Sequence, residues 1–420
     1  MKTLRSPVVA AGIAVALILT VTSVILGRAD VLVVALTLIT AVGVAASKPR
    51  AAAGSARIAM GKRHAGRVDA EIHVQTAADT DFATLRLTAM GSELRRVTLA
   101  SGARDVRVDI PVLHTGDQEL LAVTFREASA DAVRVSGPAD EVASRIVVEP
   151  VAVDLRSLPL PSRLRGLTGT HDSSRPGDGG EFRDIHPFVA GDRLRRIDWK
   201  ATARLTRSPG DLFVRRTHAT SDAHVAIVID DDTDVGERVS TWPFGDPAVG
   251  GNTTLDVARE AAWSLTCGYL DAGDSVSFQV LSRARGSVRR GAGARHRELL
   301  RAAIARVSAH PRGFARARTP QVAPGALVFV LSPFLDDDPG HLAQLWRAAG
   351  HRVIAVDTLP RLITDDLSRE RLTALRVVLG RRDDRLHDLF AVGADRLRWD
   401  ADAESRLTAL RALTRQRRRP

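Results

Sequence analysis

The stretch His224-Val-Ala-Ile-Val-Ile-Asp-Asp-Asp-Thr-Asp234 joins an apolar run to an abrupt acidic end. A short run of branched apolar residues is typical of a strand that is buried on both faces. Residues 326–331 repeat the pattern, and all of their side chains are apolar. Strands of this kind belong to parallel sheets covered by helices on both sides, so the C-terminal half of the chain is predicted to be α/β.

The segments around these two runs complete the pattern. Residues 253–270 are predicted to form a helix, because Thr253 and Asp256 have the spacing of a helix capping signal. Further strands are predicted over residues 276–281 and 353–356, and further helices over residues 297–307, 342–349, 369–379 and 403–413. We therefore expect a mostly parallel sheet in residues 223–420, and such sheets bind ligands beyond the carboxyl ends of their strands.

The acidic end of the first strand is a candidate metal site. Asp230, Asp232 and Asp234 alternate along the loop, and carboxylate oxygens are ligands that Mg²⁺ and Ca²⁺ prefer. A second acidic run, residues 336–338, can join them only if its loop folds back. The alternative interpretation is an acidic loop whose repulsion is relieved by solvent or by arginines such as Arg238. Clustered carboxylates can also hold cations for phosphoester chemistry, so a metal-dependent hydrolase is the alternative function.

The N-terminus carries two uncharged runs, residues 8–26 and 31–46, separated by Arg28 and Asp30. The first run has the roughly 20 residues that a helix needs to cross a bilayer, and the second is slightly short. Residues 1–50 are therefore predicted to form a two-pass transmembrane hairpin. The alternative, a cleaved signal peptide followed by an exported product, leaves the second run without a role.

Basic residues flank both runs. Lysine and arginine concentrate on the cytoplasmic side of membrane helices, so both termini are predicted to be cytoplasmic. These flanking residues are Lys2, Arg5, Lys48, Arg50, Arg57, Lys62 and Arg63. Residues 51–66 are predicted to be a juxtamembrane linker whose charges contact anionic lipid headgroups. The single cysteine, Cys267, fits the reducing cytoplasm.

Residues 67–152 show short runs in which apolar and polar side chains alternate. Residues 68–74, 85–89, 106–110 and 121–125 each follow this period of two, and turn-forming residues separate them. The pattern predicts a small antiparallel β-sandwich that serves as a binding or spacer module.

Residues 153–222 are predicted to be a connector that carries the densest group of turn-formers and charges. It contains Arg175-Pro-Gly-Asp-Gly-Gly-Glu-Phe182 and Gly191-Asp-Arg-Leu-Arg-Arg-Ile-Asp-Trp-Lys200. Arginine and carboxylate pair in bidentate geometry, so we expect an ion-paired network that locks an irregular loop, with Trp199 buried as its anchor. The spacing of a phosphate-binding loop is missing. The structural or partner-binding positions are Arg175, Gly177, Asp178, Gly180, Glu181, Phe182, Arg183, Gly191, Asp192, Arg195, Arg196, Asp198, Trp199 and Arg204.

The sequence of residues 175–204 resembles the core signature of the domain-of-unknown-function 58 family. The layout of the chain is similar as well, since family members commonly have two membrane helices, a β-rich segment, the signature and a von Willebrand factor A-like α/β domain. The resemblance implies association with AAA+ ATPases of the MoxR type, and no enzymatic activity is established for the family as such.

The resemblance also bears on the acidic loop. A von Willebrand factor A-like domain carries Asp-x-Ser-x-Ser there, as the first loop of a metal-ion-dependent adhesion site. Asp230 matches the aspartate, whereas Asp232 and Asp234 replace the two serines. Pro333 stands where the resemblance implies a further aspartate. The site is therefore expected to be degenerate.

These observations together predict a non-enzymatic, membrane-tethered interaction or adaptor protein. It would work with an ATPase of the MoxR type in chaperone-like or complex-assembly tasks, with membrane lipid as a second partner. The net charge of +11 does not indicate nucleic acid, because the arginines are dispersed and aromatics, at 4%, are too rare to provide stacking platforms.

Overall fold

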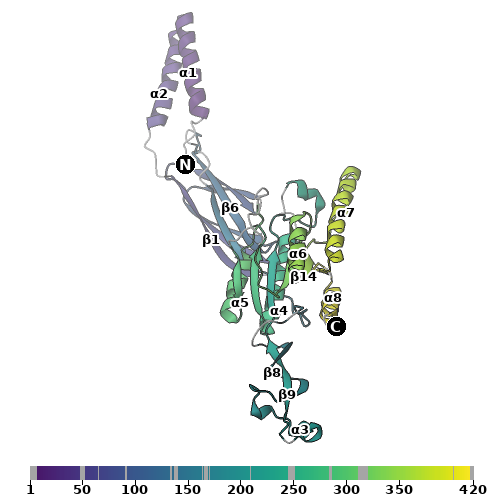
Figure 1. Cartoon of the computed structure of the whole chain (residues 1–420). Coiled ribbons are helices and arrows are strands. Elements are labelled where there is room, and N and C mark those ends of the chain that lie inside the picture. Colours follow the sequence, from purple (N-terminus) through teal and green to yellow (C-terminus); the bar gives the residue numbers. More distant parts are fainter. Residues whose placement is uncertain are drawn as a thin grey trace. The chain divides into compact units, whose positions relative to one another are not determined.

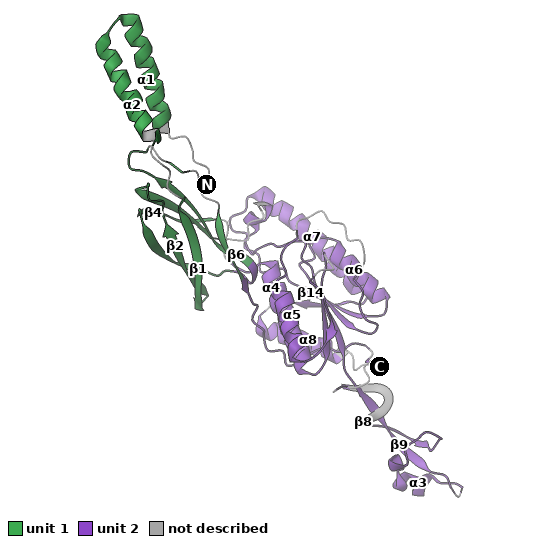
Figure 2. Ribbon diagram, turned by 90° about the vertical axis from the view of Figure 1, so that its left-hand side faces the viewer, with its two compact units in different colours: residues 1–113, 118–146 green, residues 114–117, 147–420 purple. Residues whose placement is uncertain are grey.

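The computed structural model describes residues 7–47, 53–64, 66–89, 92–132, 135–136, 141–162, 164, 169, 171–208, 210–244, 251–282, 286–310, 320–400 and 402–416. Side chains at 172–181 lie outside the described part, as do Lys2, Arg5, Lys48, Arg50 and the basic tail at 417–420. The chain forms two compact units (Figure 2). Unit 1 is Met1–Leu113 with Gln118–Ile146, and unit 2 is His114–Asp117 with Val147–Pro420.

Two apolar helices begin unit 1 (Figure 1): α1 (Pro7–Leu26) and α2 (Ala29–Ser47). Among the described residues, one helical stretch, Val8–Leu26, is long and apolar enough to cross a bilayer, and Ala29–Val44 is a shorter apolar stretch. At the turn between the helices, Arg28 pairs with Asp30 at 2.7 Å. The first apolar run is therefore confirmed as a helix of spanning length, and the two-pass topology stays a prediction.

The rest of unit 1, as far as it is described, forms two sheets with antiparallel strand pairs. One has the order β1-β2-β5 and the other β4-β3-β6-β7. Alternate side chains of both sheets, among them Ile72, Leu85 and Ile110, fill one common hydrophobic core. The strands are β1 (Ser55–His64), β2 (Arg67–Gln75), β3 (Phe82–Ala89), β4 (Ser92–Ala100), β5 (Ala103–Pro111), β6 (Gly116–Ala128) and β7 (Val142–Val148).

Strand β1 corrects the prediction of a linker over residues 51–66. Residues 55–64 pair with β2 in an antiparallel register. The small and basic composition of this segment suggested a linker, but Ala56 faces the core and Ile58 and Met60 pack against it. This alternation, although weak, is what a strand with one buried face requires.

Unit 2 is built around a sheet of order β12-β11-β10-β13-β14-β15, which has six strands within the described residues. All neighbouring strands are parallel except the edge pair β11 and β12. The mostly parallel sheet that the apolar runs predicted is thus present. Its strands are β10 (His224–Ile229), β11 (Ser275–Val280), β12 (Val288–Gly291), β13 (Leu327–Ser332), β14 (Arg352–Asp357) and β15 (Asp395–Arg398).

Helices cover both faces of this sheet. Alternation along β10 explains the arrangement, because Val225, Ile227 and Ile229 point to one hydrophobic core and Ala226 and Val228 to another. Helices α4 (Thr254–Asp271), α5 (Ala294–Ala305) and α8 (Ala403–Gln416) contribute to the first core. Helices α6 (Asp338–Ala348) and α7 (Arg369–Ala391) contribute to the second.

The segment predicted to be a loop-rich connector contains regular structure. Strand β8 (His171–Pro187) pairs antiparallel with β9 (Phe213–Ser221), with several register shifts. A 3₁₀ turn, η1 (Leu194–Arg196), and a short helix, α3 (Trp199–Leu205), lie between the two strands. A second 3₁₀ turn, η2 (Val239–Phe244), lies in the α/β part. The glycine-rich composition of β8 concealed its extended backbone, since glycine is rare in strands.

Candidate functional site

The centre of the parallel sheet defines the first candidate site. Strands β10 and β13 are neighbours, whereas β11 follows β10 on one side and β14 follows β13 on the other. The direction of the strand order therefore reverses between them, and ligands of open α/β sheets bind outside the carboxyl ends at such a point. Asp230 follows β10 here, and the acidic run at 336–338 follows β13.

Asp230 is buried, with 1% of its surface exposed. Its carboxylate accepts hydrogen bonds from Ser332 Oγ at 2.7 Å and from the backbone N–H of Asp232 at 3.1 Å. Burial, followed by the charge of Asp336, raises the pKa of Asp230 to about 7. The site thus holds a carboxyl group that neutral pH leaves only partly ionised, a state common at functional sites.

Asp336 also belongs to this site, although from the sequence it was expected there only if its loop folds back. Burial and the charge of Asp232 raise its pKa. One carboxylate oxygen, Oδ2, is buried without a hydrogen-bond partner among the described residues. Phe334 has a φ of 55°, and its N–H donates to Ser332 Oγ at 2.8 Å. The left-handed backbone at Phe334 turns the loop back toward Asp230. From the sequence, such a turn was required for the second acidic run to lie beside the first.

Asp234 contacts the start of α4, and its predicted role as a metal ligand stays a prediction. Its carboxylate accepts hydrogen bonds from Thr254 Oγ1 and from the backbone N–H of Leu255, both at 3.1 Å. These donors belong to the first turn of α4, whose N–H groups attract carboxylates. The geometry therefore ties Asp234 to the helix, whereas Asp336 interacts electrostatically with both Asp230 and Asp232.

A three-residue group of metal-ligand type does occur elsewhere among the described residues. In unit 1, ligand atoms of His64, Asp69 and Asp109 lie within 4.8 Å of one another, and all three residues are exposed. Arg67 already pairs with Asp109 there. Among the described residues, Asp230, Asp232 and Asp234 do not form a group with ligand atoms this close together.

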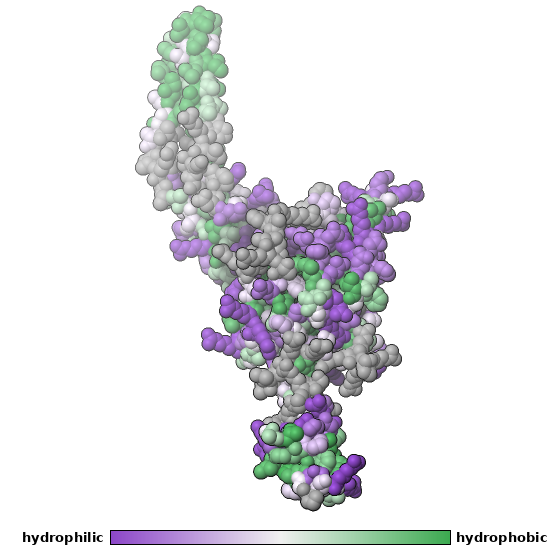
Figure 3. Space-filling model, in the orientation of Figure 1, coloured by the Kyte–Doolittle hydropathy of each residue, from purple (hydrophilic) through white to green (hydrophobic). Residues whose placement is uncertain are grey.

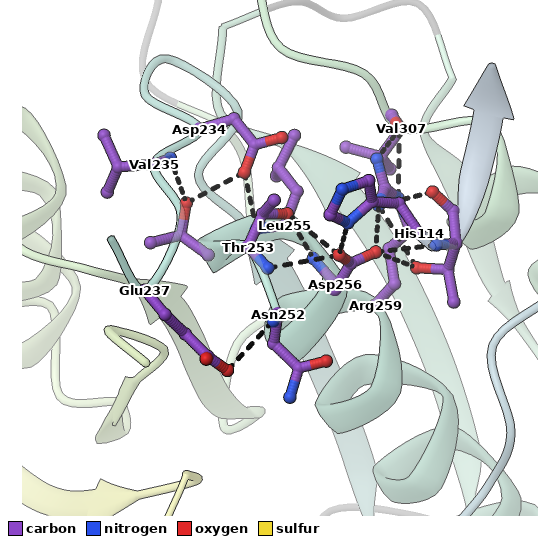
Figure 4. Close-up of polar contacts among 12 residues, drawn as sticks. His114, Asp234, Val235, Glu237, Asn252, Thr253, Leu255, Asp256, Arg259 and Val307 are labelled. Carbon is purple, nitrogen blue, oxygen red and sulfur yellow. Dashed lines mark hydrogen bonds and ion pairs between the residues drawn. The ribbon is translucent and has the colours of Figure 1, made fainter. Parts of the chain in front are cut away.

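A buried polar network fixes the start of α4 beside the acidic loop (Figure 4). Thr253 and Asp256 form the predicted capping box. Asp256 also accepts from His114 Nδ1 at 2.6 Å and from Thr115 N and Oγ1 at 2.7 Å. Burial alone would raise the pKa of Asp256, but His114, Thr115 and Arg259 overcome it and lower the value to about 2. The network holds the helix that anchors Asp234.

The second candidate site is the signature module, which we define as residues 182–216. Trp199 is 68% exposed, so the prediction that it is a buried anchor is wrong. Helix α3 has seven residues, and Ala201 is its buried member. A helix of this length buries one small side chain, that of Ala201, and the indole ring of Trp199 stays in contact with solvent.

The aspartates of the signature bind backbone N–H groups as well as arginine, and the ion-paired network predicted for the whole signature stays a prediction. Asp192 accepts from the backbone N–H of Val189 at 3.0 Å and lies 3.6 Å from Arg216. Asp198 caps α3 by accepting from Ala201 N at 2.9 Å. Gly191 has a φ of 104°, which glycine adopts without strain. The side chains of Arg175, Asp178 and Glu181 lie outside the described part.

The cap at Asp198 gives a first prediction. The change Asp198→Ala removes the acceptor for Ala201 N and is expected to destabilise α3 by about 1 kcal/mol, as loss of a helix cap does. Amide hydrogen exchange over residues 201–205 should then accelerate about fivefold in the full chain. Asp198→Asn keeps an acceptor oxygen and should stay close to the wild type. Equal protection in all three proteins would show that the cap does not hold the helix.

The fold and the two sites define an α/β domain. Acidic loops follow the carboxyl ends of its strands β10 and β13, and its signature module exposes basic and apolar side chains. Residues 184–365, which run from β8 to beyond β14, match the family model described as Protein of unknown function DUF58. This match supports the assignment to the DUF58 family that the signature indicated. No curated protein matches the chain.

Proposed function

We propose that this chain is a membrane-anchored interaction or adaptor protein, and that the signature module presents its contact surface to a protein partner. The observation that carries the proposal is the exposure of several large apolar side chains within the short signature module. Exposed apolar groups that gather on a surface mark interaction sites, whereas single ones need no explanation. Within the described residues, those of the module are Phe182, Ile185, Val189, Leu194, Trp199 and Leu205.

The resemblance supplies the partner, an AAA+ ATPase of the MoxR type. The sheet of unit 2, with its reversal of strand order and its acidic loop after β10, supports the comparison with von Willebrand factor A-like domains. Helix α1 supports an anchor in the membrane, with a two-pass hairpin and cytoplasmic termini as the finer proposal. The adaptor would hold the ATPase at the membrane or deliver clients to it.

Isolation of the complex tests this proposal. The full chain, purified from membranes of its own cells in the presence of a slowly hydrolysed ATP analogue, is expected to bring an ATPase of the MoxR type with it. The analogue matters because AAA+ proteins hold partners in nucleotide-dependent states. The matched control is the same preparation from cells that lack the chain. Recovery without any AAA+ protein above this control would contradict the proposal.

A second function rests on the acidic edge. Asp336 Oδ2 is buried without a described partner, and Asp230 is repelled by the charge of Asp336. A divalent cation would give Asp336 Oδ2 a partner and would reduce the repulsion between Asp230 and Asp336. Its protein ligands would be Asp230, Asp232 and Asp336. A bound Mg²⁺ or Ca²⁺ would supply a coordination position for a partner's carboxylate or, in a metal-dependent hydrolase, for a water nucleophile.

A further inference from the structure

We infer that the signature module, residues 182–216, docks into a groove of a partner protein that has an apolar floor and an acidic rim. The inference rests on the proposed function in one respect, namely that the partner is a protein, and it adds the chemistry of the surface that receives the module.

Three of the four aspartates of the module accept hydrogen bonds from its backbone N–H groups. Asp192 and Asp198 accept from the backbone N–H groups of Val189 and Ala201. Asp211 accepts from the N–H groups of Ser208 at 3.0 Å and Arg207 at 3.3 Å. These carboxylates stabilise turns and a helix cap, and Asp192 also lies 3.6 Å from Arg216. They leave much of the positive charge of the module without a matching carboxylate.

The module is strongly cationic. The module carries nine arginine or lysine residues against four aspartates, a net charge of +5. Within the described part of the chain, several of these side chains are exposed and form no hydrogen bond or ion pair: Arg195, Lys200, Arg204 and Arg207. Unpaired guanidinium and ammonium groups on one small segment favour an anionic partner surface.

Apolar and cationic side chains alternate on the same elements. Leu194 and Arg195 are adjacent in η1, and α3 begins with Trp199 and Lys200. Figure 3 shows the hydrophobic and hydrophilic atoms side by side on the segment that Figure 1 labels β8, β9 and α3. Tryptophan and arginine dominate the binding energy of protein interfaces, so this mixture suits a protein groove.

A lipid bilayer is a poorer occupant. The module contains loops at 188–193, 206–208 and 210–212, whose peptide groups lack the regular pairing of a helix or strand. Hydrocarbon does not tolerate such backbone, nor the partly exposed carboxylates of Asp184 and Asp211. A protein can place a donor opposite each of these groups.

Nucleic acid and a second copy of the chain are also less suited. Exposed aliphatic side chains such as Leu194 and Leu205 do not stack on bases as aromatic rings do. Two copies of a module with a charge of +5 repel each other. A protein groove with an apolar floor and an acidic rim therefore matches both the apolar and the cationic side chains of the module.

Photo-crosslinking in living cells tests the inference. The probe is the full chain with benzoylphenylalanine in place of Leu194, and the same residue in place of Val377, an exposed apolar position on α7, is the positional control. We expect the Leu194 probe to give a protein adduct whose crosslinked peptide lies in a region rich in Asp and Glu. Changing Arg195, Lys200 and Arg204 to glutamine should lower the adduct yield about tenfold, as loss of complementary rim charges lowers association rates.

The matched charge control is Arg289→Gln, an exposed arginine of β12, which should leave the yield unchanged. An adduct with the ATPase would support both proposals. An adduct with the acidic surface of another protein would support the docking inference and remove the ATPase as partner. A lipid or nucleic-acid adduct, no adduct, or a yield indifferent to the three glutamines would overturn the docking inference. Amide exchange over β8 and β9 verifies that the variants remain folded.

Discussion

Replacement of Arg259 by methionine is expected to lower the free energy of unfolding of unit 2 by about 3–5 kcal/mol, which is the cost of breaking a buried ion pair. Arg259 is 5% exposed and lies 3.3 Å from the carboxylate of Asp256. Its Nε and Nη2 donate to Val307 O at 3.1 and 2.7 Å, and its Nη1 donates to Thr115 O at 3.0 Å. Methionine fills a similar volume but leaves these acceptors without their donor.

Arg297→Met is the matched control, because Arg297 pairs with Asp271 at the surface. Exposed pairs contribute little, so this change should cost less than about 1 kcal/mol. Both variants are measured in the full chain by urea unfolding in detergent, with proteolysis of unit 2 as the readout. A loss for Arg259→Met no larger than that for Arg297→Met would show that the network does not stabilise the fold.

This network marks a limit of prediction from sequence. The capping box of α4 could be predicted, because Thr253 and Asp256 are three residues apart and begin a long helical pattern. His114 and Thr115 could not be assigned to it, because they lie more than 140 positions away and nothing local indicates that Asp256 binds them. Local patterns reveal a cap, whereas its distant partners follow from tertiary packing.

The acidic edge shows the same division. The apolar runs identified β10 and β13, and their carboxyl ends placed Asp230 correctly beside the loop that carries Asp336. The separate role of Asp234 depends on the direction of α4, which the spacing of aspartates does not contain. The exposure of Trp199 was missed for a comparable reason, since the burial of its ring depends on how the seven-residue helix α3 packs, and the buried residue of that helix is Ala201.

The change Asp230→Asn is expected to have opposite effects without and with a divalent cation. At pH 8 in a chelator, it should raise the free energy of unfolding of unit 2 by about 2–4 kcal/mol. The pKa of Asp230 is raised from 3.8 to about 7, so the folded state binds the proton more tightly than the unfolded state does. Stability therefore falls as the pH rises from about 4 to 7 and stays low above that range, and each pKa unit corresponds to about 1.4 kcal/mol. Asparagine cannot ionise, so the variant should lose this pH dependence.

Millimolar Mg²⁺ should reverse the comparison, because a cation held by Asp230, Asp232 and Asp336 stabilises the folded state in proportion to its saturation, and the asparagine variant lacks one ligand charge. Asp234→Asn separates the two explanations. Its carboxylate serves the first turn of α4, so this variant should respond to Mg²⁺ as the wild type does. Titration calorimetry with Mg²⁺, Mn²⁺ and Ca²⁺ on the full chain measures binding directly. If none of the three ions binds and Mg²⁺ leaves the wild type unchanged, the acidic edge is a charged structural site, and the hydrolase and adhesion-type interpretations fall together.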